Sequence, residues 1–195
     1  QTTQIQTQII DDDLAPQLVI SDASETEAGT VQFDVTLTGS TEYPVVVNYA
    51  TSAQTATSGG DFTATSGSLT FAVGVTAATV NVVTAHDILD EPDETFRVTL
   101  SNAVDATILD GVGVGTIIDD DSAPDLHFSL ASQNVNESVG LVTVVAVLDA
   151  VSGQAVTADY TVTGTSGSSD HTLVSGVLTI AAGATIRNIV FSVID

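Results

Sequence analysis

A strict alternation of apolar and polar residues over short stretches constrains this chain more than any other feature. In residues 31–37, valine, phenylalanine, valine and leucine alternate with glutamine, aspartate and threonine. The same period of two returns at residues 45–49, 69–73, 80–82 and 96–100. Because a period of two places successive side chains on opposite faces, it predicts β-strands with one buried face. We therefore expect an all-β chain.

Residues 14–121 contain about seven such stretches and no convincing helix. Turn signals such as the Ser-Gly-Gly-Asp run at residues 58–61 separate the stretches. Seven short alternating strands in roughly 100 residues are typical of an immunoglobulin-like antiparallel sandwich. The apolar fraction of 43% is enough for a buried core, which argues against a disordered acidic chain.

The sequence also repeats itself over a long period. The motif Ile-Ile-Asp-Asp-Asp begins at residue 9 and again at residue 117, which is 108 residues later. This period is too long for a solenoid repeat and suits whole domains in tandem. We expect residues 1–13 to be the terminal strand of a preceding repeat or a donor strand, and residues 14–121 to be a complete sandwich. Residues 122–195 should form a second, truncated sandwich that lacks equivalents of the strands at 95–101 and 112–118.

The charge balance excludes several classes of partner. The chain has 25 acidic residues against two arginines and no lysine, for a formal charge of −23. Nucleic acids and anionic lipid surfaces bind through Lys and Arg, so we expect neither as a partner. The apolar runs are far shorter than the roughly 18 residues of a membrane span, so we expect no membrane insertion. Such an acidic chain is suited to binding cations.

The acidic residues gather at predicted strand ends. Glu27 precedes a strand, Asp61 follows a Gly-Gly turn, residues 86–96 contain five acids, and residues 119–121 end the last strand. The loops of a sandwich collect at its two ends, so these groups converge if they share one end. Converging carboxylates without nitrogen or sulfur ligands favour Ca²⁺, which takes 6–8 oxygen ligands, over Zn²⁺. With this many acids we expect two or more Ca²⁺ ions in a complete site.

Other interpretations of these residues carry less support. A solvated loop would explain residues 87–94 taken alone. The three histidines could suggest Ser-His-Asp hydrolysis, but the sequence has no Gly-x-Ser-x-Gly nucleophile elbow. Asp87 and Glu91 could imitate a glycosidase pair, but the chain has three Tyr, six Phe and no Trp to form a sugar platform. We therefore expect no enzymatic activity.

Five motifs occur in a fixed order in the complete unit. They are Glu27-x-Gly29, Gly60-Asp61-Phe62, Gly67-x-Leu69-x-Phe71, Asp87-x-x-x-Glu91-x-x-Glu94-x-Phe96 and the Ile-Ile-Asp-Asp-Asp motif at residues 117–121. This pattern resembles the Calx-β domain family, found in sodium–calcium exchangers, integrin β4 and large bacterial surface proteins. The resemblance implies an immunoglobulin-like sandwich with Ca²⁺ at one tip. His86 stands where the family has an acid, and Glu94 is expected to serve local structure.

The resemblance assigns ligands position by position. In the complete unit the metal ligands would be Glu27, Asp61, Asp87, Glu91, Asp119, Asp120 and Asp121. The second unit keeps Glu137, Asp170 and Asp195 at matching positions but cannot complete a site within one chain. Asp11, Asp12 and Asp13 form a further triplet whose other ligands lie elsewhere.

These observations predict a non-enzymatic, calcium-binding structural or adhesive module. We expect it to belong to an extracellular or cell-surface protein of prokaryotic origin. In this hypothesis Ca²⁺ stiffens the domain tip and the inter-domain junction. Its partners would be calcium ions, neighbouring repeats or identical subunits, and an unidentified adhesion target. The alternative is a self-assembling filament in which the segment before Asp11 inserts into the open second unit of a neighbour. That alternative competes with the simpler view that both ends belong to longer repeats. A calcium sensor, as in the exchangers, would need a transmembrane segment.

Overall fold

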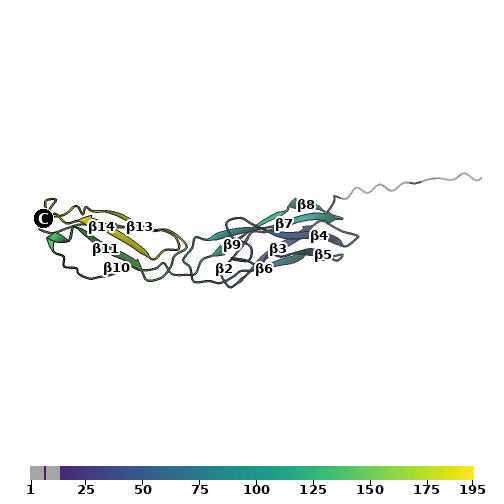
Figure 1. Ribbon diagram of the computed structural model, residues 1–195. Helices are drawn as coiled ribbons and strands as arrows, with labels where there is room; N and C mark the ends of the chain where they lie inside the picture. The colour runs from purple at the N-terminus through teal and green to yellow at the C-terminus, as the bar shows by residue number, and fades with distance from the viewer. Residues whose placement is uncertain (1–6, 8–13) are drawn as a thin grey trace, which may run out of the picture. The chain divides into compact units, whose positions relative to one another are not determined.

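The computed structural model describes residue 7 and residues 14–195. The expected terminal or donor strand and Asp11, Asp12 and Asp13 lie outside the described residues. Contacts divide the described residues into two compact units, one of residues 14–86 and 94–118 and the other of residues 87–93 and 119–195. Residues 87–93 join β6 to β7 and residues 119–121 directly follow β9, so we describe both segments with the strands of the first unit. Both units are built of β-strands, as Figure 1 shows. Among these residues, no helix has the length and apolar character that a membrane span requires.

The first unit has nine strands where the sequence predicts about seven. They are β1 (Gln17–Ile20), β2 (Ala23–Thr26), β3 (Thr30–Thr38), β4 (Val45–Ala53), β5 (Ser66–Phe71), β6 (Ala77–Val83), β7 (Glu94–Val104), β8 (Thr107–Asp110) and β9 (Val112–Ile118). The additional strands are short and lack a buried alternating face, and each is held by parallel pairing, β2 with β9 and β8 with β1.

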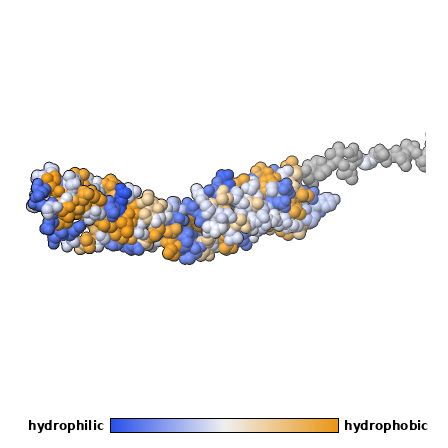
Figure 2. All heavy atoms as spheres, viewed as in Figure 1, coloured by the Kyte–Doolittle hydropathy of each residue, from blue (hydrophilic) through white to orange (hydrophobic). Residues whose placement is uncertain are grey.

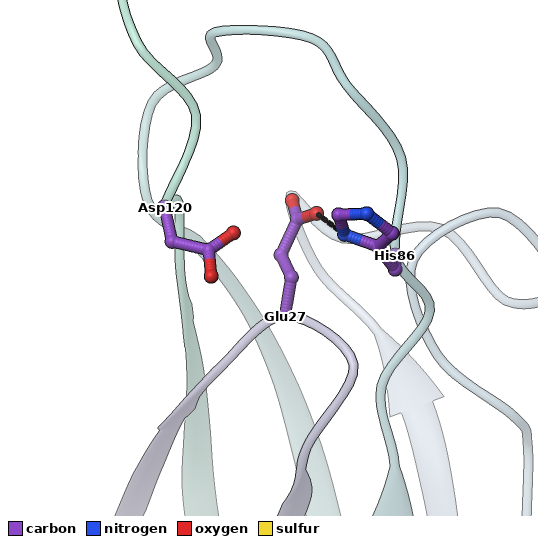
Figure 3. A group of neighbouring side chains, drawn as sticks. All are labelled: Glu27, His86 and Asp120. Atoms are coloured by element: carbon purple, nitrogen blue, oxygen red, sulfur yellow. Dashed lines mark ion pairs between the residues drawn. The ribbon is translucent and has the colours of Figure 1, made fainter.

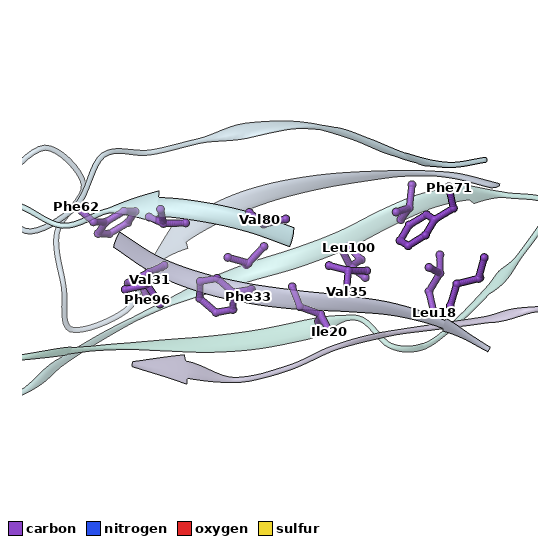
Figure 4. Packing of buried hydrophobic residues seen from close by; sticks show 14 of the residues in the cluster. Leu18, Ile20, Val31, Phe33, Val35, Phe62, Phe71, Val80, Phe96 and Leu100 are labelled. Atoms are coloured by element: carbon purple, nitrogen blue, oxygen red, sulfur yellow. The ribbon is translucent and has the colours of Figure 1, made fainter. Parts of the chain in front are cut away.

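Two sheets face each other across the core of this unit. One has the order β6-β3-β1-β8 and the other β2-β9-β7-β4-β5. The alternation predicted for residues 31–37 is confirmed, because Val31, Phe33, Val35 and Leu37 are all at most 4% exposed. Figure 4 shows how the apolar side chains of both sheets meet along β3.

An aromatic cluster lies at the centre of this core. The rings of Phe62 and Phe96 stack with centroids 4.6 Å apart, and Phe33 meets Phe96 edge to face at 5.8 Å. Gly115 of β9 makes room for these rings, since a Cβ there would lie 2.5 Å from the Phe96 ring and 2.8 Å from the Phe33 ring. Strands β7 and β9 therefore close the core over Phe33.

The second unit repeats part of this plan. Its strands are β10 (Leu126–Phe128), β11 (Leu141–Leu148), β12 (Val156–Tyr160), β13 (Gly176–Ile180) and β14 (Ile186–Ser192), with a 3₁₀ turn at Glu137–Val139. Strand β11 pairs with β10 and β14, and β12 pairs with β13. The core is smaller and contains Ala146, Leu148, Leu178 and Ile180. Within the described strands β12 has one partner, whereas β4 of the first unit has two.

Candidate metal centre

The strand register of the first unit brings its acidic loops to one tip. Thr26, the last residue of β2, pairs with Ile118 at the end of β9. Glu94, the first residue of β7, pairs with Ile117. Thr30 at the start of β3 pairs with Val83 at the end of β6. The β2–β3 turn, both ends of the β6–β7 loop and the segment after β9 therefore share one end of the strands.

Backbone hydrogen bonds fix the turn that carries Glu27. The Glu27 N–H donates to the Ile118 carbonyl at 3.2 Å, and the Ala28 N–H donates to the Ala85 carbonyl at 2.9 Å. The buried Thr84 hydroxyl accepts from Gly29 N–H at 2.8 Å and donates to the Thr26 carbonyl at 3.2 Å. This turn places the Glu27 carboxylate, with a side chain 11% exposed, 3.8 Å from His86 Nδ1 (Figure 3).

Asp61 is held by the turn in which it lies. Its Oδ2 accepts from the Thr57 N–H at 2.5 Å and from the Thr57 hydroxyl at 2.8 Å. Partial burial alone would raise the pKa of Asp61, but the hydrogen bonds from Thr57 and Glu94 outweigh it and lower the pKa below 3.8. The carboxylate is thus oriented and kept charged.

The aspartates after β9 are less well satisfied. The Asp119 N–H donates to Asp93 Oδ1 at 3.2 Å. Asp119 Oδ1 and Asp121 Oδ2 are buried and have no hydrogen-bond partner among the described residues. Partial desolvation, with the negative charges of Asp121 and Asp90, raises the pKa of Asp119 above 3.8. Buried carboxylate oxygens without partners are costly unless a cation meets them.

Three groups of side chains bring ligand atoms within 4.8 Å of one another. They are Glu27, His86 and Asp120; Glu27, Asp87 and Asp121; and Asp61, Glu91 and Glu94. Figure 3 shows the first group, with Glu27 between His86 and Asp120. Ligands on opposite sides of Ca²⁺ lie about 4.6–5.2 Å apart, because each metal–oxygen distance is roughly 2.3–2.6 Å. The spacing and the oxygen-rich donor set therefore fit a hard cation.

Six of the seven ligands expected in the complete unit fall in these groups, and the seventh, Asp119, carries a partnerless buried oxygen instead. His86 and Glu94 also belong to the groups although the sequence did not assign them as ligands. His86 could have been found from the sequence, because it stands where the resembled family has an acid. Glu94 stands in the acidic motif of residues 87–96, but it was expected to serve local structure, and the motif alone did not distinguish it as a ligand.

The acidic residues of the second unit show a different arrangement. Asp170 accepts from Gly167 N–H at 2.8 Å and from the Ser169 hydroxyl at 3.1 Å, and these bonds lower its pKa. Glu137 begins the exposed 3₁₀ turn and Asp195 is exposed. Within residues 14–195 none of the three joins a ligand group of three. A metal-binding role for them stays a prediction, as it does for Asp11, Asp12 and Asp13.

Together, the fold and the tip define a β-sandwich module with a cluster of carboxylates at one end of its strands. The model of the Calx-beta domain matches residues 11–117 and again residues 119–195. The chain therefore belongs to the Calx-beta domain family, as the motifs predicted.

Solved structures agree with this assignment. The apo-form Calx CBD1 domain has 25% identity and a TM-score of 0.53, and the match covers 55% of this chain and all of that one. CBD12 from CALX1.2 has 22% identity and a TM-score of 0.52 over 92% of this chain and 75% of that one. The calcium binding domain CBD12 of CALX1.1 has 22% identity and a TM-score of 0.50 over 91% and 76%. No curated protein matches the sequence.

Proposed function

We propose that the chain is a non-enzymatic, calcium-binding structural module, with its principal site at the tip of the first unit. The observation that carries this proposal is the pair of buried, partnerless oxygens on Asp119 and Asp121. Asp121 also groups with Glu27 and Asp87. A matched structure is described as a calcium-binding domain, which supports Ca²⁺ as the cation for this oxygen-rich donor set.

The ligand groups support more than one ion. Glu27, Asp87 and Asp121 form one group of oxygen ligands, and Asp61, Glu91 and Glu94 form a separate one. The group that contains His86 is the weakest calcium position, since Ca²⁺ takes oxygen ligands. We assign the first ion to Glu27, Asp87 and Asp121, with Asp119 and Asp120 adjacent, and a second ion to Asp61 and Glu91.

The mechanism is electrostatic. Without Ca²⁺ the carboxylates of the β6–β7 loop and of residues 119–121 repel one another. Desolvation first, and then the negative charges of Asp121 and Asp90, raise the pKa of Asp119. With Ca²⁺ the same groups are drawn to a shared ion, which orders the loop and the segment after β9. That segment runs into Ser122-Ala123-Pro124, where proline already limits the backbone. Calcium would thus stiffen the junction between consecutive repeats.

An extracellular or cell-surface setting agrees with this mechanism. Calcium-binding extracellular modules work with dissociation constants of roughly 10⁻⁴–10⁻³ M. Sites of this strength would remain filled outside a cell and keep a row of repeats rigid. The chain has no lysine and a formal charge of −23. This composition favours a role in adhesion at a prokaryotic surface.

Calorimetric titration of the chelator-treated chain with Ca²⁺ tests the proposal. Two or more ions should bind, and Asp121→Asn should remove at least one. Asp34→Asn is the matched control, because Asp34 is an exposed acid of β3 that belongs to no ligand group, and it should leave the isotherm unchanged. Absence of binding heat and of any thermal shift in wild type would contradict the proposal, as would equal isotherms for Asp121→Asn and wild type.

A second candidate function is assembly by strand donation, favoured by one feature of the second unit. A cleft of about 280 Å³ opens there between residues that include Phe128, Val144, Tyr160 and Ile189. It lies beside β12, and in the first unit β7 and β9 close the corresponding space. A segment such as residues 1–10 of another copy could add a strand, and its Asp11, Asp12 and Asp13 would join Glu137, Asp170 and Asp195.

This second candidate predicts polymers that depend on calcium. Sedimentation velocity should show large species in millimolar Ca²⁺ that dissolve in chelator, and removal of residues 1–13 should abolish them. One donated strand fills the place of only one of the two strands that close the first unit. Particles of unchanged size after removal of residues 1–13 would contradict donation without affecting the calcium proposal.

A further inference from the structure

The outward face of the β10-β11-β14 sheet is apolar although it points away from the core. In β11, Val142, Ala146 and Leu148 are at most 5% exposed and point inward. The alternate residues therefore point outward, as do their partners in β14. We define the outer patch as the large apolar residues among them: Leu141, Val145, Val147, Ile186 and Val190.

The residues of the outer patch are contiguous and accessible. Val147 pairs directly with Ile186, and Val190 pairs with Thr143, which lies two residues before Val145. Directly opposed side chains lie about 4.5–5.5 Å apart between Cβ atoms, so these residues form one surface. Leu141, Ile186 and Val190 are 67%, 57% and 56% exposed. Figure 2 shows apolar side chains at the surface of the second unit, interspersed with hydrophilic ones.

The first unit provides an internal reference for this face. Its β3 and β6 pair in the equivalent register, because Thr30 faces Val83 as Leu141 faces Ser192. The outward residues of β3 are polar from end to end: Thr30, Gln32, Asp34, Thr36 and Thr38. On β6 they are Ala77, Thr79, Asn81 and Val83. The same sheet face thus carries one large apolar residue in the first unit and five in the second.

Completion of the second sandwich cannot cover the outer patch. Strands equivalent to β7 and β9 would extend the sheet of β12 and close the inner cleft, as they do around Phe33 in the first unit. They would lie on the opposite side of β11 from the outer patch. A contiguous exposed apolar surface of this kind marks an interaction site, so the patch calls for a partner of its own.

The charge distribution indicates which partner fits. The outward positions of β11 and β14, together with His127 of β10, carry no carboxylate, in a chain whose net charge is −23. Two copies repel wherever their acidic surfaces meet, and this face lets them approach without burying a carboxylate. Flat faces with β-branched residues also pack well on one another at about 10 Å. We propose that the outer patch is a two-fold contact between two copies of the chain, packed sheet against sheet.

Analytical ultracentrifugation of residues 1–195 in chelator tests this contact separately from calcium binding. The wild type should reach a monomer–dimer equilibrium that stops at the dimer. Raising the salt from about 0.05 to 0.5 M should strengthen association, because it screens the repulsion between acidic surfaces. Val190→Asp should weaken dimerisation at least tenfold, and Val190→Thr should weaken it less while keeping a β-branched residue in the strand.

Val83→Asp is the matched control. Val83 lies on the equivalent face of the first unit, is 54% exposed and stands opposite Thr30, so this change should leave dimerisation unaltered. Circular dichroism should show that each variant keeps its β-structure. A chain that stays monomeric at several hundred micromolar and high salt would overturn the proposal. A dimer equally weakened by Val83→Asp, or unaffected by Val190→Asp and Val190→Thr, would do the same.

Discussion

Phe62 of the first unit and His171 of the second occupy equivalent places and behave differently. Each follows the aspartate of its loop and forms an isolated bridge to the strand end of its unit, Phe62 with Thr84 and His171 with Val193. Phe62 is 2% exposed and stacks on Phe96 of β7. His171 meets Phe191 edge to face at 6.2 Å, and its Nδ1 is buried without a hydrogen-bond partner among the described residues.

This difference shows that the core and the carboxylate cluster of the first unit depend on the same two strands. β7 begins at Glu94 and supplies Phe96, and β9 supplies Gly115 and leads into Asp119–Asp121. In the second unit, β10–β14 supply no such closure, and Glu137, Asp170 and Asp195 form no ligand group of three within the described chain. The carboxylate cluster of the first unit therefore depends on the two strands that close the core beneath it.

The largest effect should come from breaking the aromatic closure. Phe96→Ala removes the contacts with Phe62 and Phe33 and should destabilise the first unit by about 3–5 kcal/mol. Phe128→Ala is the matched change in the second unit, where Phe128 is 48% exposed, and it should cost well under half as much. Urea unfolding of both variants measures the two values. Equal losses would show that the two cores do not differ as described.

A change at Asp119 should separate calcium affinity from the stability of the calcium-free protein. Because the folded-state pKa of Asp119 is raised above 3.8, its contribution to stability is present below that value and is lost as pH rises through the folded-state pKa. Asp119→Asn should therefore raise the melting temperature in chelator at pH 7 and lower calcium affinity about tenfold or more, which corresponds to about 1.4 kcal/mol. Calorimetry with and without Ca²⁺ measures both. A lower melting temperature in chelator would contradict the proposed repulsion.

Thr57 offers a smaller test of how Asp61 is held. Thr57→Val removes the hydroxyl bond to Asp61 and keeps the backbone bond, at a cost of about 1 kcal/mol or less. The folded-state pKa of Asp61 is lowered, so its stabilisation is present above pH 3.8 and is lost as pH falls through the folded-state pKa. In the variant this loss should be smaller and should be complete at higher pH, because the folded-state pKa moves back toward 3.8. Unfolding between pH 2 and 6 measures the shift, and superimposable profiles would argue against the bond.

The smallest effect is expected at Asp170, whose carboxylate accepts a hydrogen bond within its own turn and joins no group of three ligands in residues 14–195. Asp170→Asn should leave the number of Ca²⁺ ions bound by the monomer unchanged, because Asp170 joins no ligand group within the described residues. Titration of this variant beside Asp61→Asn makes the comparison direct. Loss of an ion with Asp170→Asn would show that the second unit holds a site of its own.

The sequence predicted the sandwich architecture because alternation reports burial directly, as Val31, Phe33, Val35 and Leu37 show. It missed β2 and β8 because those strands have no alternating buried face and are held by parallel pairing alone. It also placed Glu27, Asp61, Asp87 and Glu91 in loops that the register brings to the tip. The inclusion of Glu94 depends on the direction of one side chain at a strand start, which periodicity does not fix.

Hydrogen–deuterium exchange with and without Ca²⁺ measures whether cations order the tip of the first unit. We expect slower exchange in Ca²⁺ at the amides of residues 86–94 and 119–121, with little change in β3 and β4, whose amides the core already protects. Exchange rates in the two segments that do not differ between Ca²⁺ and chelator would contradict the claim.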